Sequence, residues 1–585
     1  MKDLWKYLAP YKKESILGPL FKLLEASFEL FVPLVMAAII DRGIAMQDTG
    51  YILRMGLILV VLAIIGLTCA LTAQYFAAKA SVGFATSIKS ALFAHIQTLS
   101  YTELDTLGTD TLITRMTSDM NQVQNGMNLT LRLLLRSPFV VFGAVIMAFS
   151  INVRAALIFA VAVPLLCVVV FGIMLWTMPL YKKVQASLDR VLGLTRENLT
   201  GARVLRAFRM EHAEEERFRA QNEELTARQL FVGRISAMMN PVTFIIINVA
   251  TVILLWSGAI RVDNGILSQG EVIALVNYMS QILVELVKMA NLIINITKAL
   301  ACADRVSSVM RIETTMKPVE QSMVPVAKGD ENAPILEMRN VGLTYAGAGE
   351  SSLEHLNLKV QKGQTVGIIG GTGSGKSSLV NLIPRYYDAT EGEVLLAGRN
   401  VKEYLLDEVR DLVGMVPQKA VLFTGTIRDN LLFGRDKDAS EVSDEDLNVA
   451  LETAQAKDFV DSRPNGLDDL LTQGGKNLSG GQKQRLTIAR ALVRKPKILI
   501  LDDSASALDF ATDARLRQAI RHLDPEMTVF IVSQRTASVR FADQIIVLED
   551  GQIAGTGTHE ELLENCEVYQ EIYYSQFPKQ EGGQA

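Results

Sequence analysis

Six long apolar runs occupy the first half of this 585-residue sequence and restrict what it can fold into. A helix of about 20 apolar residues is long enough to cross a hydrocarbon core of about 30 Å. The clearest runs, 55–78 and 155–176, contain no charged residue, and six runs in one half of a chain favour membrane spans over buried core helices. We therefore expect an α-helical membrane domain with six transmembrane helices. The runs cover residues 16–40, 55–78, 131–151, 155–176, 237–260 and 271–300.

Lys and Arg are distributed unevenly among the connections between these runs. The long connections, 79–130 and 177–236, contain fourteen of them, and residues 1–14 add four. The three short connections contain four in total. Because Lys and Arg near membrane spans are retained on the cytoplasmic side, we expect the long connections and both termini to be cytoplasmic. Both long connections have a helical pattern, with predicted turns at Gly108 and Gly201.

The pattern changes after residue 310. Residues 1–310 are predicted to form the membrane domain, with an amphipathic interfacial helix at the N-terminus. Residues 311–333 are polar and contain Pro, which is typical of a linker. Residues 334–585 alternate short β-branched runs with helical ones, which predicts a parallel α/β domain.

Charge and cysteine content exclude some classes of protein. The formal net charge of −5 argues against a nucleic-acid-binding protein, which would be basic overall. The four cysteines lie too far apart for a metal knuckle or a disulfide framework.

A glycine-rich segment follows the strand-like run 365–369. It reads Gly370-Gly371-Thr372-Gly373-Ser374-Gly375-Lys376-Ser377 and precedes a helical run that opens at Ser378. The pattern GxxxxGK[ST] between a strand and a helix is typical of a phosphate-binding loop, in which backbone N–H groups surround the phosphates. Lys376 is expected to reach the outer phosphates and Ser377 to bind Mg²⁺.

A second buried strand is predicted at 498–501, and it ends in Asp502-Asp503. Phosphate-loop enzymes hold their magnesium with a carboxylate at the end of such a strand. Asp502 is therefore the predicted carboxylate on the metal side. Mg²⁺ and a nucleoside triphosphate are the expected cofactors.

Between these segments lies Leu478-Ser479-Gly480-Gly481-Gln482, followed by a helical run. This segment resembles the signature sequence of ATP-binding-cassette (ABC) proteins. Six spans followed by one cassette resemble an ABC exporter half-transporter of the multidrug type, and this likeness covers essentially the whole chain. The resemblance implies that ATP binds between two cassettes, with the signature of one capping the γ-phosphate held by the other.

The same resemblance assigns further residues. Tyr345 fits the aromatic residue that stacks on adenine, and Gln418 fits the glutamine that senses the γ-phosphate and the metal. Ser506-Ala507-Leu508-Asp509 fits the D-loop, and the turns at Gly108 and Gly201 fit the coupling helices.

Two positions depart from the family's pattern. Competent ABC exporters have a glutamate directly after the magnesium-side aspartate, where this chain has Asp503. The family also has a histidine after the strand at 528–532, where this chain has Gln534. A shorter carboxylate and an uncharged amide both predict slow cleavage. We therefore expect Asp503, Gln534 and Gln418 to be the residues that act on the nucleotide, in a degenerate site.

These departures favour a subunit of a heterodimeric exporter that moves drugs or other hydrophobic or cationic compounds. Its own site would bind ATP and cleave it poorly, while its intact signature completes the partner's competent site. Two alternatives stay open, a homodimeric lipid or peptide exporter and a non-transporting ATP-sensing regulator. A bacterial plasma membrane is the simplest location.

Charged residues inside predicted spans mark candidate substrate contacts. Lys22, Glu25 and Glu29 recur on one face of the first span, and Glu285 and Lys288 lie in the sixth. Either these residues pair with one another, or Glu25 or Glu29 faces a cavity and attracts cationic amphiphiles.

Overall fold

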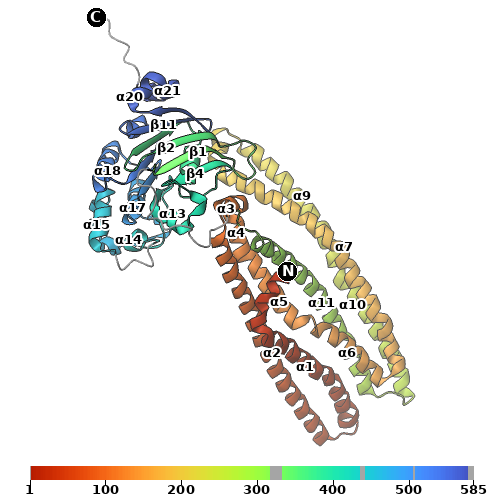
Figure 1. The fold of residues 1–585 in the computed structure, drawn as a ribbon. Coiled ribbons are helices and arrows are strands. Elements are labelled where there is room, and N and C mark those ends of the chain that lie inside the picture. The colour runs from red at the N-terminus through yellow and green to blue at the C-terminus, as the bar shows by residue number, and fades with distance from the viewer. Residues whose placement is uncertain (1, 317–332, 435–441, 505–507, 578–585) are drawn as a thin grey trace. The chain divides into compact units, whose positions relative to one another are not determined.

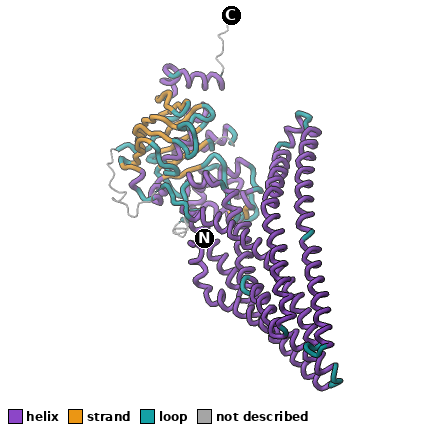
Figure 2. Tube along the Cα trace, turned by 90° about the vertical axis from the view of Figure 1, so that its right-hand side faces the viewer, coloured by secondary structure: helices purple, strands orange, loops and turns teal. Residues whose placement is uncertain are grey.

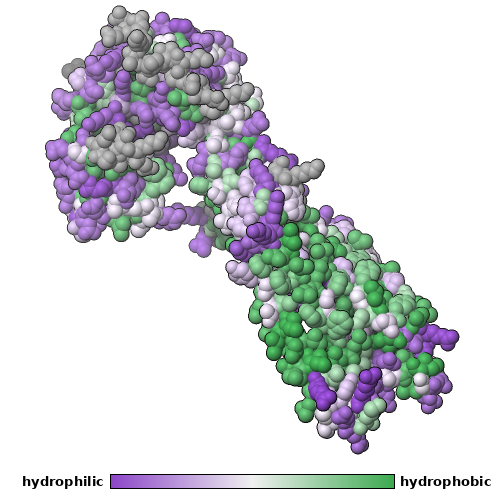
Figure 3. Space-filling view, turned by 60° about the horizontal axis from the view of Figure 1, so that its bottom comes forward, coloured by the Kyte–Doolittle hydropathy of each residue, from purple (hydrophilic) through white to green (hydrophobic). Residues whose placement is uncertain are grey.

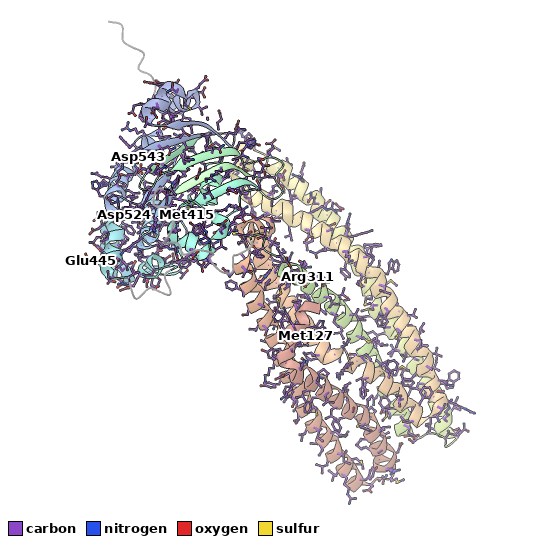
Figure 4. All side chains as sticks on the ribbon, viewed as in Figure 1. Met127, Arg311, Met415, Glu445, Asp524 and Asp543 are labelled. Carbon is purple, nitrogen blue, oxygen red and sulfur yellow. The ribbon has the colours of Figure 1, made fainter. Side chains whose placement is uncertain are left out.

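The chain divides into two compact units, which are described separately. The computed structural model describes residues 2–316, 333–434, 442–504 and 508–577. The first unit comprises residues 1–97 and 109–312, and the second comprises residues 98–108 and 313–585. Most of the predicted linker, 317–332, lies outside the described residues. Met127 on α5 belongs to the first unit and Met415 on β6 to the second (Figure 4).

The first unit consists of long helices (Figure 1). Among the described residues, six helical segments are long and apolar enough to cross a membrane. The predicted fold of the first half is therefore confirmed. The helices are η1 (Lys2–Tyr11), α1 (Lys12–Ala38), η2 (Ile39–Ile44), α2 (Thr49–Thr98), α4 (Thr109–Thr114), η3 (Arg115–Asp119), α5 (Met120–Leu133), α6 (Arg136–Ile151), α7 (Val153–Thr200), α8 (Ala202–Ala207), α9 (Glu211–Ala237), α10 (Met239–Asp263) and α11 (Gln269–Met310).

The apolar side chains of this unit face outward as well as inward. Leu57, Leu67 and Leu71 of α2 are 65%, 60% and 63% exposed. Figure 3 shows the resulting hydrophobic surface on the helical unit. A surface of this kind is stable only in a solvent as apolar as the side chains, which the lipid interior supplies.

The N-terminal stretch is helical but tighter than an α-helix. η1 is a 3₁₀ helix that contains Pro10 and continues directly into α1. The predicted turn at Gly201 is short, because α8 begins immediately after this residue. A residue with a left-handed backbone follows at Arg209, which has φ 55° and lies between α8 and α9.

The second unit is built on β-sheets covered by helices (Figure 2). Its main sheet has the order β12-β11-β3-β10-β9-β6, and β3, β6, β9, β10 and β11 run parallel. A second, antiparallel sheet has the order β2-β1-β4-β5. The strands are β1 (Leu336–Leu343), β2 (Leu353–Val360), β3 (Thr365–Gly370), β4 (Glu391–Leu396), β5 (Arg399–Asn400), β6 (Val413–Val416), β7 (Gly425–Thr426), β8 (Leu470–Leu471), β9 (Ile498–Asp502), β10 (Thr528–Val532), β11 (Gln544–Glu549) and β12 (Gln552–Gly557).

The central strands are apolar because helices cover both faces of the parallel sheet. Every residue of β9 and β10 is buried. Asp543, just before β11, accepts a hydrogen bond from the Thr365 amide at 2.8 Å and fixes the start of β3 (Figure 4). The helices are α3 (Tyr101–Leu107), α12 (Lys376–Leu382), α13 (Leu406–Leu412), α14 (Ile427–Leu431), α15 (Asp444–Thr453), α16 (Lys457–Asp461), α17 (Gly480–Val493), α18 (Phe510–Leu523), α19 (Thr536–Val539), α20 (His559–Asn565) and α21 (Glu567–Gln576).

The short helix α3 belongs to the second unit although it lies between helices of the first. It begins with a capping box, in which the Ser100 amide donates to Glu103 at 2.8 Å. The same carboxylate accepts from the amide and hydroxyl of Thr315 at 3.1 and 2.7 Å. Burial opposes ionisation of Glu103, but these hydrogen bonds outweigh it and lower its pKa.

Candidate nucleotide-binding site

The phosphate loop lies at the carboxyl end of β3, where ligands of parallel α/β sheets bind. It connects β3 to α12, as the sequence predicts. Gly373 and Gly375 adopt φ 85° and 91°, which residues with a Cβ rarely reach. A Cβ at Gly370 would lie 2.2 Å from the Leu548 carbonyl oxygen, so that position has no room for a side chain.

Lys376 is folded onto the loop itself. Its ammonium donates to the carbonyl oxygens of Gly370 and Gly371 at 3.0 and 2.5 Å and to the Ser374 hydroxyl at 3.3 Å. Burial lowers the pKa of Lys376, against the opposing effect of two nearby aspartates. A cation already placed at the loop is suited to bind phosphate oxygens.

The metal-side residues lie together at the end of β9. The Ser377 hydroxyl donates to the Asp502 carboxylate at 3.1 Å. Burial raises the pKa of Asp502, partly offset by this hydrogen bond. Hydroxyl and carboxylate oxygens beside a phosphate loop fit Mg²⁺, which prefers oxygen ligands and is usually bound by few protein groups plus phosphates. Ser377 and Asp502 would hold the ion, which supplies charge neutralisation for the phosphates when bound.

Asp503 and Gln418 face each other across the site. Gln418, which follows β6, donates from its side-chain nitrogen to Asp503 at 3.3 Å. Asp503 has a left-handed backbone with φ 45°, and its amide donates to the Val532 carbonyl at 3.0 Å. Asp503 is thus bonded to β10 through its backbone and to Gln418 through its carboxylate.

A cavity of about 250 Å³ brings most of the predicted site residues together. Gln534 lines it from the segment after β10, opposite the loop. Ser352 lines it as well, which the sequence did not indicate. The lining residues are Ser352, Thr372, Gly373, Gly375, Lys376, Ser377, Ser378, Gln418, Asp502, Asp503, Val532, Ser533 and Gln534.

Tyr345 lies beside the loop helix without lining this cavity. Its hydroxyl donates to the Ser378 hydroxyl at 2.9 Å. Its ring meets that of Tyr387 edge to face, with centroids 5.0 Å apart. Tyr387 in turn donates to Asp105 of α3 at 2.5 Å, and the rings of Tyr101 and Tyr386 lie 4.7 Å apart.

This row of contacts joins the predicted adenine-stacking ring to α3, inside one compact unit. The sequence predicted a coupling helix at Gly108 but not its partners. The adjacent tyrosines Tyr386 and Tyr387 were the sequence feature that could have indicated these partners.

The signature residues do not line this cavity. Ser479 caps α17 in a capping box with Gln482, whose side chain accepts from the Ser479 amide at 2.9 Å. Gly480 and Gly481 lie in the first turn of α17, where Gly480 is exposed and Gly481 is partly buried. Asp509 caps α18 by accepting from the Thr512 amide at 3.3 Å. Ser506 and Ala507 of the predicted D-loop lie outside the described residues.

The charged residues of the spans form two groups. Lys22 pairs with Glu25 at 2.5 Å. Glu29 pairs with Arg136 of α6 at 2.6 Å, and Arg136 also binds Glu285 of α11 at 2.6 Å.

Ser137 and Lys288 complete the second group by donating to Glu285 at 2.8 and 2.9 Å. The sequence analysis did not single out Arg136 or Ser137, although an arginine inside the apolar run 131–151 was a visible signal. Glu29, Glu285 and Lys288 line a cavity of about 430 Å³ among α1, α6 and α11, together with Asn277 and Gln281.

Comparisons with known proteins agree with this arrangement. Residues 15–286 match the family described as the ABC transporter transmembrane region, and residues 353–506 match the family described as ABC transporter. An uncharacterised ABC transporter ATP-binding protein of Mycobacterium tuberculosis is 36% identical over 98% of this chain and 97% of its own length. The ATP-dependent lipid A-core flippase of Salmonella typhimurium is 29% identical over 98% and 97%.

A solved structure has the same fold. The chain superposes on a bacterial Atm1-family ABC exporter with ATP bound, with a TM-score of 0.77 and 22% identity, over 99% of this chain and 100% of the other. The confirmed fold is thus a six-helix membrane domain followed by an ABC ATPase domain. The chain joins a multi-pass membrane unit to a cytoplasmic ATPase unit, the two parts of an ATP-driven exporter, and it belongs to the ABC transporter family.

Proposed function

We propose that this chain is one half of a heterodimeric ABC exporter in a bacterial plasma membrane. Its phosphate loop, Ser377 and Asp502 bind ATP and Mg²⁺ in a site that cleaves slowly. Its signature segment at Ser479 completes the site owned by the partner. The observation that carries the proposal is that Asp503 and Gln534 line the nucleotide cavity at the two positions where family members carry a glutamate and a histidine.

The chemistry of Asp503 supports slow cleavage. Its side chain is one methylene shorter than that of glutamate, so the carboxylate is set back by roughly 1 Å, and displacements of that order cost on the order of 10²-fold in rate. Asp503 is also bonded to Gln418 and through its backbone to β10, which limits any compensating movement.

Gln534 supports the same conclusion independently. An amide can hydrogen-bond a phosphate oxygen, but it carries no positive charge to stabilise the charge that develops during phosphoryl transfer. None of the five histidines lies at this position. Asp503 and Gln534 are both groups expected to act in cleavage, whereas the phosphate loop is intact. This combination fits a site that binds ATP but cleaves it slowly.

A second subunit is supported by what the chain leaves exposed. Ser479, Gly480 and Gly481 do not line the cavity of their own cassette. At the second predicted coupling helix, Leu199 and Phe208 are each 75% exposed and Val204 is 58% exposed. Apolar side chains gathered at one cytoplasmic helix are typical of a protein contact, and a second half-transporter is the partner that the signature requires.

The proposed cargo is a hydrophobic or cationic small molecule. Glu29, although paired with Arg136, is 42% exposed and lines the cavity among α1, α6 and α11, whereas Glu25, paired with Lys22, does not line it. The lipid A-core flippase among the relatives supports a lipid cargo as the second candidate. Loss of transport of cations but not of neutral dyes in Glu29→Gln would support the first, and equal loss of both would favour the second.

The decisive experiment compares the chain alone with the native assembly. The full-length chain is purified with and without the companion polypeptide recovered from native membranes, and the ATPase rate of each sample is measured. We expect ATP binding in both samples and rapid cleavage only in the pair. Turnover typical of exporters by the chain alone would overturn the heterodimer and the degenerate site together.

A further inference from the structure

The segment that carries Gln534 is short and lies between two regular elements. β10 ends at Val532 and α19 begins at Thr536, so residues 533–535 form the whole connection. Gln534 lines the nucleotide cavity. The position of the Gln534 side chain depends on what holds the backbone of these residues, here called the switch segment.

A single side chain from α21 bonds the backbone on both sides of Arg535. The Gln576 side-chain nitrogen donates to the Gln534 carbonyl oxygen at 2.8 Å. Its side-chain oxygen accepts from the Thr536 amide at 2.9 Å. One planar amide thus uses its donor and its acceptor on backbone groups two residues apart.

The contact caps α19 from a distant helix, beside a local bond from the Arg535 amide to the Ser533 hydroxyl at 3.0 Å. The residue before α19 is Arg535, which makes no side-chain capping bond to the helix in the described chain. Its guanidinium lies 5.0 Å from the ring centroid of Phe510, the first residue of α18. The first amide of α19 would otherwise lack a capping acceptor, and Gln576 supplies one from a helix about 40 residues away.

The helix that presents Gln576 is firmly placed. Tyr569 of α21 is fully buried, and its hydroxyl lies 2.8 Å from the His559 ring nitrogen. Tyr569 belongs to the same apolar core as Val539 of α19 and Ile545 of β11. Gln576 is therefore the last residue of a helix, α21, that is packed into the apolar core.

We propose that Gln576 is a positioning residue that sets Gln534 against the γ-phosphate of bound ATP. The inference rests on the proposed role of the cavity as an ATP site, but on neither slow cleavage nor heterodimer formation. Because ADP lacks the γ-phosphate, Gln576 should influence the affinity for ATP and leave that for ADP unchanged.

The test measures equilibrium affinities of the full-length chain for ATP and ADP in the presence of Mg²⁺. We expect Gln576→Ala to lower the affinity for ATP about fivefold, the effect of roughly one hydrogen bond, and to change that for ADP less than twofold. Gln576→Glu should act at least as strongly, since it brings a carboxylate oxygen against the Gln534 carbonyl.

Gln570→Ala is the matched control. Gln570 lies on the same helix and donates to the Leu563 carbonyl at 2.8 Å, so its loss perturbs α21 without touching the switch segment. It should leave the ratio of ATP to ADP affinities unchanged. An equal shift of that ratio in Gln570→Ala would show that α21 acts only by packing.

A double-variant cycle tests the route of the effect. In a Gln534→Ala background, Gln576→Ala should produce no further fall in ATP affinity. Additive losses, or equal losses for ATP and ADP, would overturn the inference. Fast ATPase by the chain alone would refute the degenerate site and leave this inference standing, whereas a wild-type chain that binds no ATP would refute the proposed function itself.

Discussion

The two sides of the nucleotide cavity differ in how closely they match the pattern that the family resemblance implies. On the binding side, the loop, Lys376 and the Ser377–Asp502 pair have the residues and contacts that phosphate and Mg²⁺ need. On the side proposed to act in cleavage, Asp503 and Gln534 stand where the family resemblance implies a glutamate and a histidine. Under the proposed function, ATP binding and ATP cleavage are separable in this cassette, because different side chains are proposed to carry them. The following experiments test that separation.

Removing the loop cation should have the largest effect. Lys376→Ala deletes charge-assisted hydrogen bonds of about 1.5–3 kcal/mol each, so ATP affinity at this site should fall at least about 100-fold. Equilibrium binding to the full-length chain measures it. Lys362→Ala, which removes a surface ion pair with Glu526, is the control and should change the affinity little. Unchanged binding in Lys376→Ala would show that the intact side is not the binding side.

Blocking the signature should stop cleavage in the assembly without weakening this chain's own ATP binding. In Ser479→Arg the bulky cation replaces a hydroxyl at the first turn of α17, and the ATPase rate of the pair should fall about 100-fold, as for loss of an oxyanion donor. Ser443→Arg is the control, because Ser443 caps α15 in the same way. Loss of ATP affinity in isolated Ser479→Arg would contradict the division of roles.

Restoring the cleaving side should produce a gain. The double variant Asp503→Glu, Gln534→His should raise cleavage by this chain's site about tenfold or more, since a correctly reaching base and a chargeable group return. Single-turnover hydrolysis in the assembly measures the gain. The same Asp→Glu change at Asp543, which bonds β3 away from the cavity, should have no effect. An unchanged cleavage rate in the double variant would show that slow cleavage at this site has another cause.

The smallest effect is expected where the cassette meets α3. Tyr387→Phe removes the hydroxyl that bonds Asp105 and should lower substrate-stimulated ATPase about two- to fivefold, with ATP affinity unchanged. Burial, with help from Asp105, raises the pKa of Tyr387, so the hydroxyl keeps its proton across the physiological range. Tyr386→Phe is the control. A fall in ATP affinity in Tyr387→Phe would tie this contact to binding.

Features of the fold and of the site that depend on residues close together in the sequence were predictable. The six spans follow from run length, and the phosphate loop follows from glycines between a strand and a helix. Asp502 and Asp503 follow from a buried strand that ends in carboxylates, and their placement at the cavity agrees with that expectation.

Contacts between distant residues were not predictable in this way. Arg136 reaches two carboxylates on different helices, and only the packing of α1, α6 and α11 brings them together. Gln576 looks like any polar residue near a chain end until α21 folds against α19. The assignment of α3 to the second unit likewise depends on tyrosines more than 280 residues away.

The placement of α3 has a consequence for biogenesis. The ribosome makes residues 98–108 before the rest of the helical bundle, and the segment from Glu313 onward comes last. At about 5–20 residues per second, α3 waits on the order of ten seconds or longer for the surface that will hold it. The nascent chain therefore carries an unfinished cytoplasmic end until translation is nearly complete, and a prematurely terminated product would retain the bundle with this helix undocked.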